Sequence, residues 1–184
     1  MKKNMLQNQA LMFDEKALNN TTNLIIWLWF VWSNLAYNLF KTWFKNFILV
    51  DYDTVEEKNL LNQIYNTKEL VGTKKATALK YILDTESSNL WINNFITKKE
   101  EKWEKVIKEL LNSQDKIENY NVFITVDNLE SRKYMVKLLL KYINKFINTN
   151  IFIIWANWDW FLYEHIILWN NYEIDREKVK NYEE

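Results

Sequence analysis

The 184-residue chain is long enough for one domain with its own hydrophobic core and too short for two ordinary domains. Its 24 basic and 24 acidic side chains leave a formal net charge of zero, which argues against a nucleic-acid-binding protein. The absence of cysteine excludes disulfides, cysteine-ligated zinc and a cysteine nucleophile.

The N-terminal part of the chain bears on cellular location. Residues 1–22 are polar with scattered apolar positions and are expected to form an N-terminal arm or short helix. The apolar run that follows is interrupted by Ser33, Asn34 and Asn38, well before the about 20 residues of a membrane span. The polar N-terminus is also unlike a secretion signal. We therefore expect a cytoplasmic protein that binds neither membrane nor nucleic acid.

Strand and helix patterns then alternate along the chain. Apolar runs predict strands at 24–28, 47–50, 90–96, 121–126 and 151–154, with 161–168 completing a C-terminal hairpin. Helical spacing predicts helices at 33–42, 74–83, 98–111 and 129–147, and residues 51–66 are polar and irregular. This alternation predicts an α/β fold, a Rossmann-like mainly parallel sheet with helices on both faces and a site at the strands' carboxyl ends. We expect one domain over 23–170, preceded by the arm and followed by a polar tail at 171–184.

The contents of tryptophan and glycine are both abnormal. Gly72 is the only glycine, although glycine ordinarily supplies about 7% of residues, and there are ten tryptophans. Trp27, Trp29 and Trp32 have the spacing of the G-x-G-x-x-G nucleotide loop between an expected strand and helix, and Asp51 matches the acidic residue that follows in that motif.

Two interpretations of these tryptophans are open. They can form an aromatic core cluster, or they can stand for glycine because a UGA codon that the source reads as glycine was translated as tryptophan. We favour the second interpretation, since the glycine deficit matches the tryptophan excess. A nucleotide loop also needs bare backbone, because an indole would fill the space of the nucleotide.

Read with glycine at those positions, the chain resembles the ThiF/MoeB/HesA family, the ubiquitin-activating-enzyme-like adenylyltransferases. Trp43 falls on a further glycine of the family. The other matching motifs are L-V-D-Y-D-T-V-E at 49–56, N-L-L-N-Q at 59–63, V-G-T-K-K-A at 71–76, and T-V-D-N at 125–128 followed by Arg132.

The resemblance implies a site for ATP and Mg²⁺. Asp51 would accept the ribose hydroxyls, Lys75 would hold phosphate as a compact cation, and Asp127 would carry Mg²⁺. The implied catalytic residues are Lys75, Asp127 and Asn62. The implied nucleotide-binding residues are Trp27, Trp29, Phe30, Trp32, Asp51, Asp53, Asn59, Gln63, Lys75 and Asn128.

Several of these residues also have an ordinary structural interpretation. Asp51 can end a strand, Asp53 can stabilise a turn, and Lys75 can be an exposed helix lysine. Asp127 and Asn128 can cap the helix that follows them. His165, the only histidine, falls in no motif and is expected to be structural.

The resemblance implies adenylation of the C-terminal carboxylate of a small ubiquitin-like or sulfur-carrier protein, by a homodimer or heterodimer. Asn62 replaces the family's arginine, and Arg132 and Arg176 are the only arginines in the chain. The alternative is therefore a non-catalytic scaffold subunit that pairs with an active partner. A dehydrogenase-type nucleotide binder is less favoured, because the motifs at 49–56 and 59–63 have no role in it.

Overall fold

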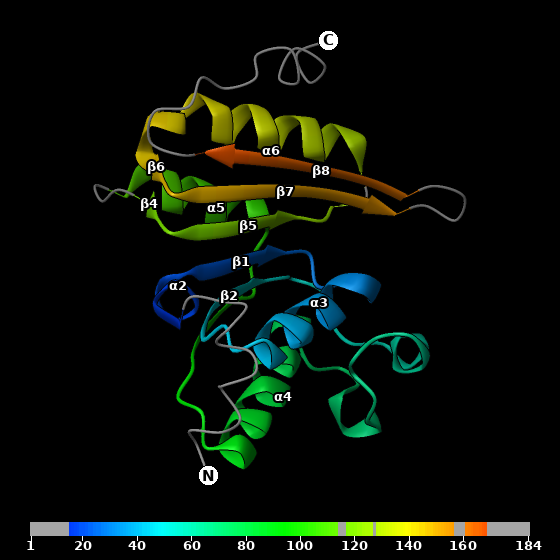
Figure 1. Ribbon diagram of the computed structural model, residues 1–184. Helices are drawn as coiled ribbons and strands as arrows, with labels where there is room; N and C mark the ends of the chain where they lie inside the picture. The colour runs from blue at the N-terminus through cyan, green and yellow to red at the C-terminus, as the bar shows by residue number, and fades with distance from the viewer. Residues whose placement is uncertain (1–14, 114–116, 127, 157–160, 169–184) are drawn as a thin grey trace.

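The computed structural model describes residues 15–113, 117–126, 128–156 and 161–168. Its main sheet has six strands in the order β3-β2-β1-β5-β7-β8 (Figure 1). Five strands are parallel, and the last runs antiparallel to β7, which confirms the mainly parallel sheet and the C-terminal hairpin. The strands are β1 (Thr22–Ile26), β2 (Asn46–Val50), β3 (Phe95–Lys99), β5 (Tyr120–Ile124), β7 (Thr149–Ala156) and β8 (Phe161–Leu168).

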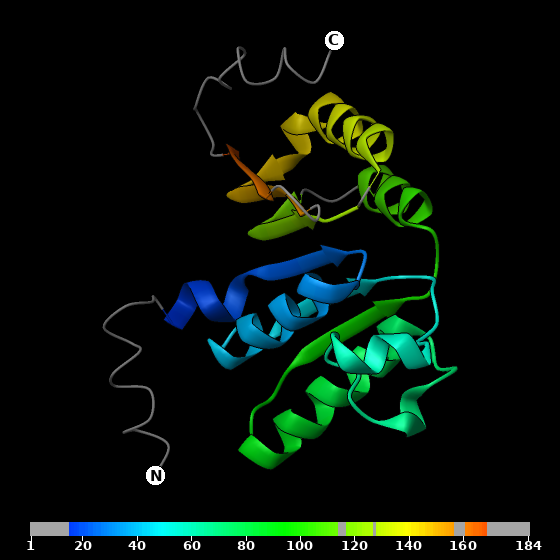
Figure 2. The same ribbon diagram turned by 90° about the vertical axis from the view of Figure 1, so that its right-hand side faces the viewer.

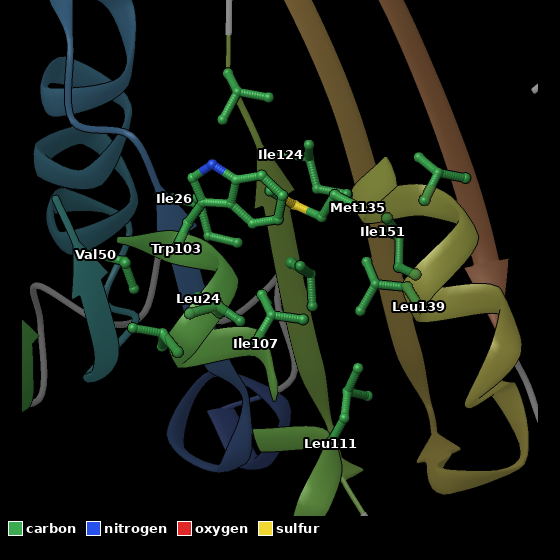
Figure 3. Close-up of a cluster of buried hydrophobic side chains, with 14 of the residues drawn as sticks. Leu24, Ile26, Val50, Trp103, Ile107, Leu111, Ile124, Met135, Leu139 and Ile151 are labelled. Atoms are coloured by element: carbon green, nitrogen blue, oxygen red, sulfur yellow. The ribbon is translucent and has the colours of Figure 1, made fainter. Parts of the chain in front are cut away.

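Helices cover both faces of the sheet, as expected for a Rossmann-like α/β fold. The helices α3 (Phe30–Lys41) and α4 (Lys75–Leu90) lie on one face, and α5 (Trp103–Asn112) and α6 (Leu129–Lys141) lie on the other (Figure 2). Each pair encloses a separate hydrophobic cluster; Figure 3 shows the cluster under α5 and α6. Central strands buried from both faces explain the near-continuous apolar runs in the sequence.

Short elements complete the described chain. A six-residue helix α2 (Glu15–Asn20) precedes β1. Two 3₁₀ helices, η1 (Glu57–Leu61) and η2 (Lys68–Leu70), lie between β2 and α4. A third, η3 (Ile143–Lys145), follows α6, and β4 (Ile117–Glu118) pairs in parallel with β6 (Phe146–Ile147). In the described ranges, no helix combines the length and apolar character needed to cross a bilayer.

The structure corrects the predicted bounds between residues 51 and 111. The expected strand at 90–96 is wrong: α4 runs to Leu90, and the strand is Phe95–Lys99, whose backbone pairs with β2. The helix expected from residue 98 begins at Trp103, because Lys98 and Lys99 still belong to this strand. The stretch 51–66, expected to be irregular, contains η1.

The helix expected over 129–147 is also too long, since α6 ends at Lys141. The ammonium of Lys145 donates to the backbone oxygens of Leu111 and Ser113, each at 2.6 Å. These are carbonyls at the end of α5, and such groups have no partner within a helix. The residues after α6 therefore hold the end of a neighbouring helix instead of extending their own.

Asparagine amides connect strands at the amino edge of the sheet. The Nδ2 of Asn150 donates to Oδ1 of Asn121 at 2.9 Å, and Nδ2 of Asn121 donates to Oδ1 of Asn23 at 3.0 Å. Asn23 in turn donates to the backbone oxygen of Asn46 at 3.2 Å. Asn23 is fully buried, so these bonds satisfy amide groups that lie away from water.

The strand order reverses beside β1. From β1 the chain continues outward to β2 and β3, and then returns to β5 on the other side of β1. The register pairs Ile26 with both Val50 and Ile124, so the carboxyl ends of three strands meet at one edge. Ligands of open α/β sheets bind at such a reversal point.

Candidate functional site

The loop after β1 brings the predicted site residues to this edge. The backbone of Trp27 is left-handed, with φ of 75°, and its N–H donates to the carbonyl of Val50 at 2.9 Å. Leu28 is fully buried, and Trp29 then forms the extended N-cap of α3 without a side-chain cap bond. The loop thus makes a tight turn from strand to helix, where glycine is ordinarily required.

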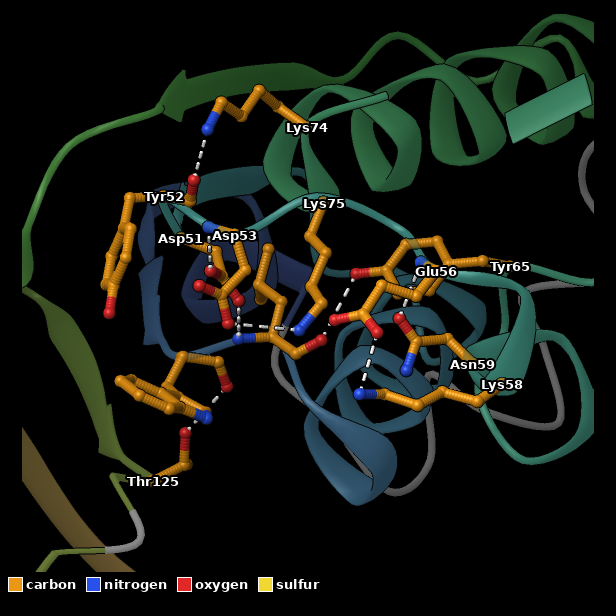
Figure 4. Close-up of polar contacts among 12 residues, drawn as sticks. Asp51, Tyr52, Asp53, Glu56, Lys58, Asn59, Tyr65, Lys74, Lys75 and Thr125 are labelled. Atoms are coloured by element: carbon orange, nitrogen blue, oxygen red, sulfur yellow. Dashed lines mark hydrogen bonds and ion pairs between the residues drawn. The ribbon is translucent and has the colours of Figure 1, made fainter. Parts of the chain in front are cut away.

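The Asp51 carboxylate anchors this loop to the end of β2. Its Oδ2 accepts the N–H of Leu28 at 2.8 Å, and its Oδ1 accepts the N–H of Asp53 at 2.8 Å (Figure 4). Asp51 is only 4% exposed, and this burial raises the pKa of its carboxyl. The two backbone bonds and the charge of Lys75 act in the opposite direction, because they favour the ionised form.

Lys75 is not an exposed helix lysine. Its side chain is 5% exposed, and its Nζ lies 3.3 Å from Oδ2 of Asp53. The backbone N–H of Lys75, at the start of α4, also donates to the carbonyl of Asp53 at 2.9 Å. Together these contacts hold an ammonium group close to the loop.

Two further side chains hold the loop, and their roles were not predicted from the sequence. The Thr125 hydroxyl, just beyond β5, donates to the carbonyl of Trp27 at 2.9 Å and also contacts the carbonyl of Ile26. The Tyr65 hydroxyl donates to the carbonyl of Leu28 at 3.2 Å, and Tyr65 is fully buried. Thr125 lies in a quoted motif, but Tyr65 lies in a stretch with no signal beyond one aromatic residue.

The predicted residues around η1 lie in different environments. Asn59 is buried, and its Oδ1 accepts the N–H of Glu56 at 2.8 Å within a capping box. Asn62, at the position of the family's arginine, is exposed at the end of η1. Gln63 is 6% exposed, and both atoms of its amide lack a hydrogen-bond partner in the described structure. Such a buried amide is available to a ligand.

The predicted residues at the other end of the site are only partly described. Asn128 is exposed, and its Oδ1 accepts the N–H groups of Glu130 and Ser131 at 2.8 and 3.2 Å, so it caps α6. Asp127 lies outside the described residues. The side chains of His165 and of Phe30, the first residue of α3, are not described either. Among the described residues, no group of three acidic or histidine side chains is placed to hold a metal.

Tryptophans occupy several backbone positions that are typical of glycine. Trp27, Trp43 and Trp91 have positive φ of 75°, 76° and 57°, in the same region as Gly72 at 85°. At the end of α3, the N–H groups of Trp43 and Phe44 donate to the carbonyls of Phe40 and Leu39. This pair of bonds is the Schellman motif, whose left-handed residue is usually glycine.

The end of α4 has the same pair of bonds. The N–H of Trp91 donates to the carbonyl of Ser88 at 3.3 Å, and that of Ile92 donates to the carbonyl of Ser87 at 3.0 Å. Trp29 and Trp32 differ, because Trp29 is extended and Trp32 lies in the first turn of α3, 5% exposed. Trp103 is helical and belongs to the core under α5 and α6.

The parallel sheet, its helices on both faces and the loop after β1 at the point where the strand order reverses define a Rossmann-like α/β protein. The model of the ThiF family matches residues 11–165. The chain therefore belongs to the ThiF family, as its motifs at 49–56 and 59–63 indicated. A search of curated protein sequences gave no match.

Three solved structures from E. coli share this fold. MccB with succinimide has a TM-score of 0.68 and 15% identity, over 91% of this chain and 49% of that chain. MccB with ATP has a TM-score of 0.57 and 16% identity, over 76% and 39%. The tRNA N6-threonylcarbamoyladenosine dehydratase TcdA with AMP has a TM-score of 0.61 and 19% identity, over 77% and 56%. This chain thus spans between 39% and 56% of the length of the chains in these three structures.

Proposed function

We propose that this chain is an ATP- and Mg²⁺-dependent adenylating domain that activates the C-terminal carboxylate of a small ubiquitin-like or sulfur-carrier protein. The observation that carries the proposal is the loop after β1, whose backbone is held by Asp51 beside the buried ammonium of Lys75. An oxygen of the carrier's carboxylate would attack the α-phosphorus of ATP. The bond to the β-phosphate would break and pyrophosphate would leave, so that positioning and charge neutralisation supply most of the catalysis.

The chemistry of Asp51 and Lys75 suits a nucleotide. Each oxygen of Asp51 accepts one backbone N–H, and a carboxylate oxygen has a second lone pair that can accept a ribose hydroxyl. Lys75 presents a compact cation that can exchange part of its contact with Asp53 for phosphate. The unpartnered amide of Gln63 and the Nδ2 of Asn59 are further donors in the same segment.

Asp127 is the proposed ligand of Mg²⁺. The described carboxylates near the loop are engaged elsewhere, since Asp51 binds two backbone N–H groups and Asp53 pairs with Lys75. One carboxylate together with phosphate oxygens of ATP is a donor set that Mg²⁺ accepts. When bound, the ion would neutralise charge on the triphosphate. Asn128, by contrast, has a capping role that can exist without nucleotide.

We also propose that Trp27, Trp29, Trp32, Trp43 and Trp91 are glycine in the native protein, through a UGA codon read as glycine. The left-handed backbone at Trp27 and the two Schellman motifs ending at Trp43 and Trp91 support this. For Trp29 and Trp32 the support is their spacing within the loop. Intact-mass measurement of the protein from its native host tests the proposal, since a mass with ten tryptophans would contradict it.

A non-catalytic scaffold subunit is the second candidate function. Asn62 is neutral and exposed where the family carries arginine, and Arg132 is buried in α6. An amide cannot neutralise phosphate charge as a guanidinium does. In this case the chain would form a stable heterodimer whose partner supplies the arginine and the turnover.

Pyrophosphate exchange separates the two candidates. The glycine-restored protein, defined here as the Trp27→Gly, Trp29→Gly, Trp32→Gly variant, would be assayed with candidate carrier proteins, with and without Asn62→Arg. Exchange by either form supports adenylation, and Lys75→Ala should abolish it. ATP binding without exchange in both forms favours the scaffold function, and the lack of both contradicts the proposed site.

A further inference from the structure

Leu28, in the middle of the loop, is held at both of its backbone polar groups by side chains from later segments. Its N–H donates to Asp51, and its carbonyl accepts the hydroxyl of Tyr65, which lies 37 residues further along the chain (Figure 4). The preceding peptide group is held at both ends as well, because the carbonyl of Trp27 accepts the hydroxyl of Thr125. Two successive peptide planes are therefore fixed by three side chains.

The planarity of the peptide bond gives the Tyr65 contact a directional effect. The described backbone has no cis peptide bond, so the N–H of Trp29 points opposite to the carbonyl of Leu28 in the same plane. Tyr65 draws that carbonyl inward, toward the core beneath the loop. The N–H of Trp29 is consequently directed away from the core, toward the face where the side chain of Trp29 is 45% exposed.

We propose that Tyr65 is a positioning residue of the nucleotide loop, whose hydroxyl fixes the peptide of residues 28 and 29 so that its N–H faces the phosphates. The inference rests on the proposed function for the identity of the ligand. Without the hydroxyl, this peptide can rotate and present its carbonyl to the phosphates, where it would repel them. Phenylalanine would fill the same space but would leave the Leu28 carbonyl without its donor.

The surroundings keep Tyr65 in the donor form. Burial raises the pKa of its phenol well above the ordinary value of 10.0, and the nearby negative charge of Asp51 acts in the same direction. The hydroxyl therefore stays protonated at neutral pH. An ionised tyrosine would accept hydrogen bonds only and would repel the carbonyl of Leu28.

Tyr65→Phe in the glycine-restored protein tests this inference against a purely structural role. Tyr120→Phe is the control, because it removes a phenol hydroxyl that is half-buried and bonds the side chain of Thr22 at the amino edge of the sheet, far from the loop. For each variant, ATP affinity would be measured by calorimetry, and the NMR signal of the residue 29 amide, which shares its peptide plane with the Leu28 carbonyl, would be recorded. Urea unfolding would report global stability.

We expect Tyr65→Phe to weaken ATP binding by about five- to tenfold and to shift the NMR signal of the residue 29 amide, because that peptide is released. Tyr120→Phe should change ATP affinity by less than about twofold and leave that signal in place, even where its loss of stability is equal. An unchanged residue 29 signal in Tyr65→Phe would overturn the inference, as would an equal loss of ATP affinity in Tyr120→Phe. If the glycine-restored protein binds no ATP, the proposed function fails, while the signal of the residue 29 amide still decides the role of Tyr65.

Discussion

The end of α4 offers a direct test of whether glycine belongs where tryptophan stands. Trp91 has φ of 57° and ψ of 38° and is 82% exposed. A left-handed backbone costs a residue with a Cβ atom about 1–2 kcal/mol. Because so little of the indole is buried, its removal forfeits little hydrophobic stabilisation.

The expected net effect of Trp91→Gly is therefore a gain in the free energy of unfolding. Relief of the left-handed backbone should stabilise the fold by about 1–2 kcal/mol. The greater entropy of glycine in the unfolded chain offsets about 0.5–1 kcal/mol of this, which leaves a net gain of about 0.5–1 kcal/mol. For a chain of this length, that raises Tm by about 1–4 °C. Urea unfolding followed by circular dichroism measures it directly.

A comparison with alanine separates backbone conformation from the loss of the indole. Trp91→Ala keeps the Cβ atom and should be about 0.5–1 kcal/mol less stable than Trp91→Gly. At Trp103, which is helical and 6% exposed, the order should reverse, with Ala more stable than Gly by about 0.5–1 kcal/mol. Both Trp103 variants should lose about 3–5 kcal/mol relative to the parent. If Trp91→Ala proves as stable as Trp91→Gly, the backbone argument is wrong.

Three further predictions concern the site and the sheet. Burial raises the pKa of the Asp51 carboxyl above its ordinary 3.8, so the folded protein binds the carboxyl proton more tightly than the unfolded chain does. The contribution of Asp51 to the free energy of unfolding is therefore greatest at acid pH and is lost as the pH rises through the raised pKa. ATP binding needs the ionised carboxylate of Asp51, so ATP affinity should weaken as the pH falls through the same pKa. Calorimetry on the glycine-restored protein measures this, and a pH dependence of ATP affinity that Asp51→Asn leaves unchanged would contradict it. Thr125→Val removes the bond to the carbonyl of Trp27 and should weaken ATP binding about fivefold with little change in shape; an unaltered Kd would show that this bond is dispensable. Asn121→Ala removes one hydrogen bond from the amide of Asn23 and one from the amide of Asn150, and should cost about 2 kcal/mol in urea unfolding; a loss below about 0.5 kcal/mol would argue against a stabilising role for these amide contacts.

The central strands and the position of the site could be predicted from the sequence. Residues 24–28 and 47–50 are apolar without alternation because both faces of β1 and β2 are covered, and Asp51 directly after β2 then marks the strand end. The edge strand β3 could not be placed in the same way. Phe95 and Thr97 are exposed, while the apolar residues just before them belong to the end of α4.

The contacts that hold the loop after β1 in place could not be predicted from the sequence. Tyr65 reaches the carbonyl of Leu28 because the irregular chain between β2 and α4 folds back over the loop. The sequence of that stretch has no periodicity from which this course could be predicted. The capping role of Asn128 was foreseen as an alternative, whereas the burial of Lys75 depends on α4 starting against Asp53. The left-handed backbone at Trp91 was not foreseen either, because that residue was assigned to a strand.

The asparagine amides at the amino edge have a consequence at the opposite end of the sheet. The strands β1 and β5 are both five residues long and paired from Thr22 with Tyr120 to Ile26 with Ile124. A shift of one residue would turn the amide of Asn121 to the other face of the sheet, and a shift of two would carry it past Asn23. The side-chain hydrogen bond between Asn23 and Asn121, 98 positions apart, therefore helps to fix which residue after β5 lies beside Trp27. In this way a polar contact at one edge aligns Thr125 with the carbonyl of Trp27, four residues further along each chain segment.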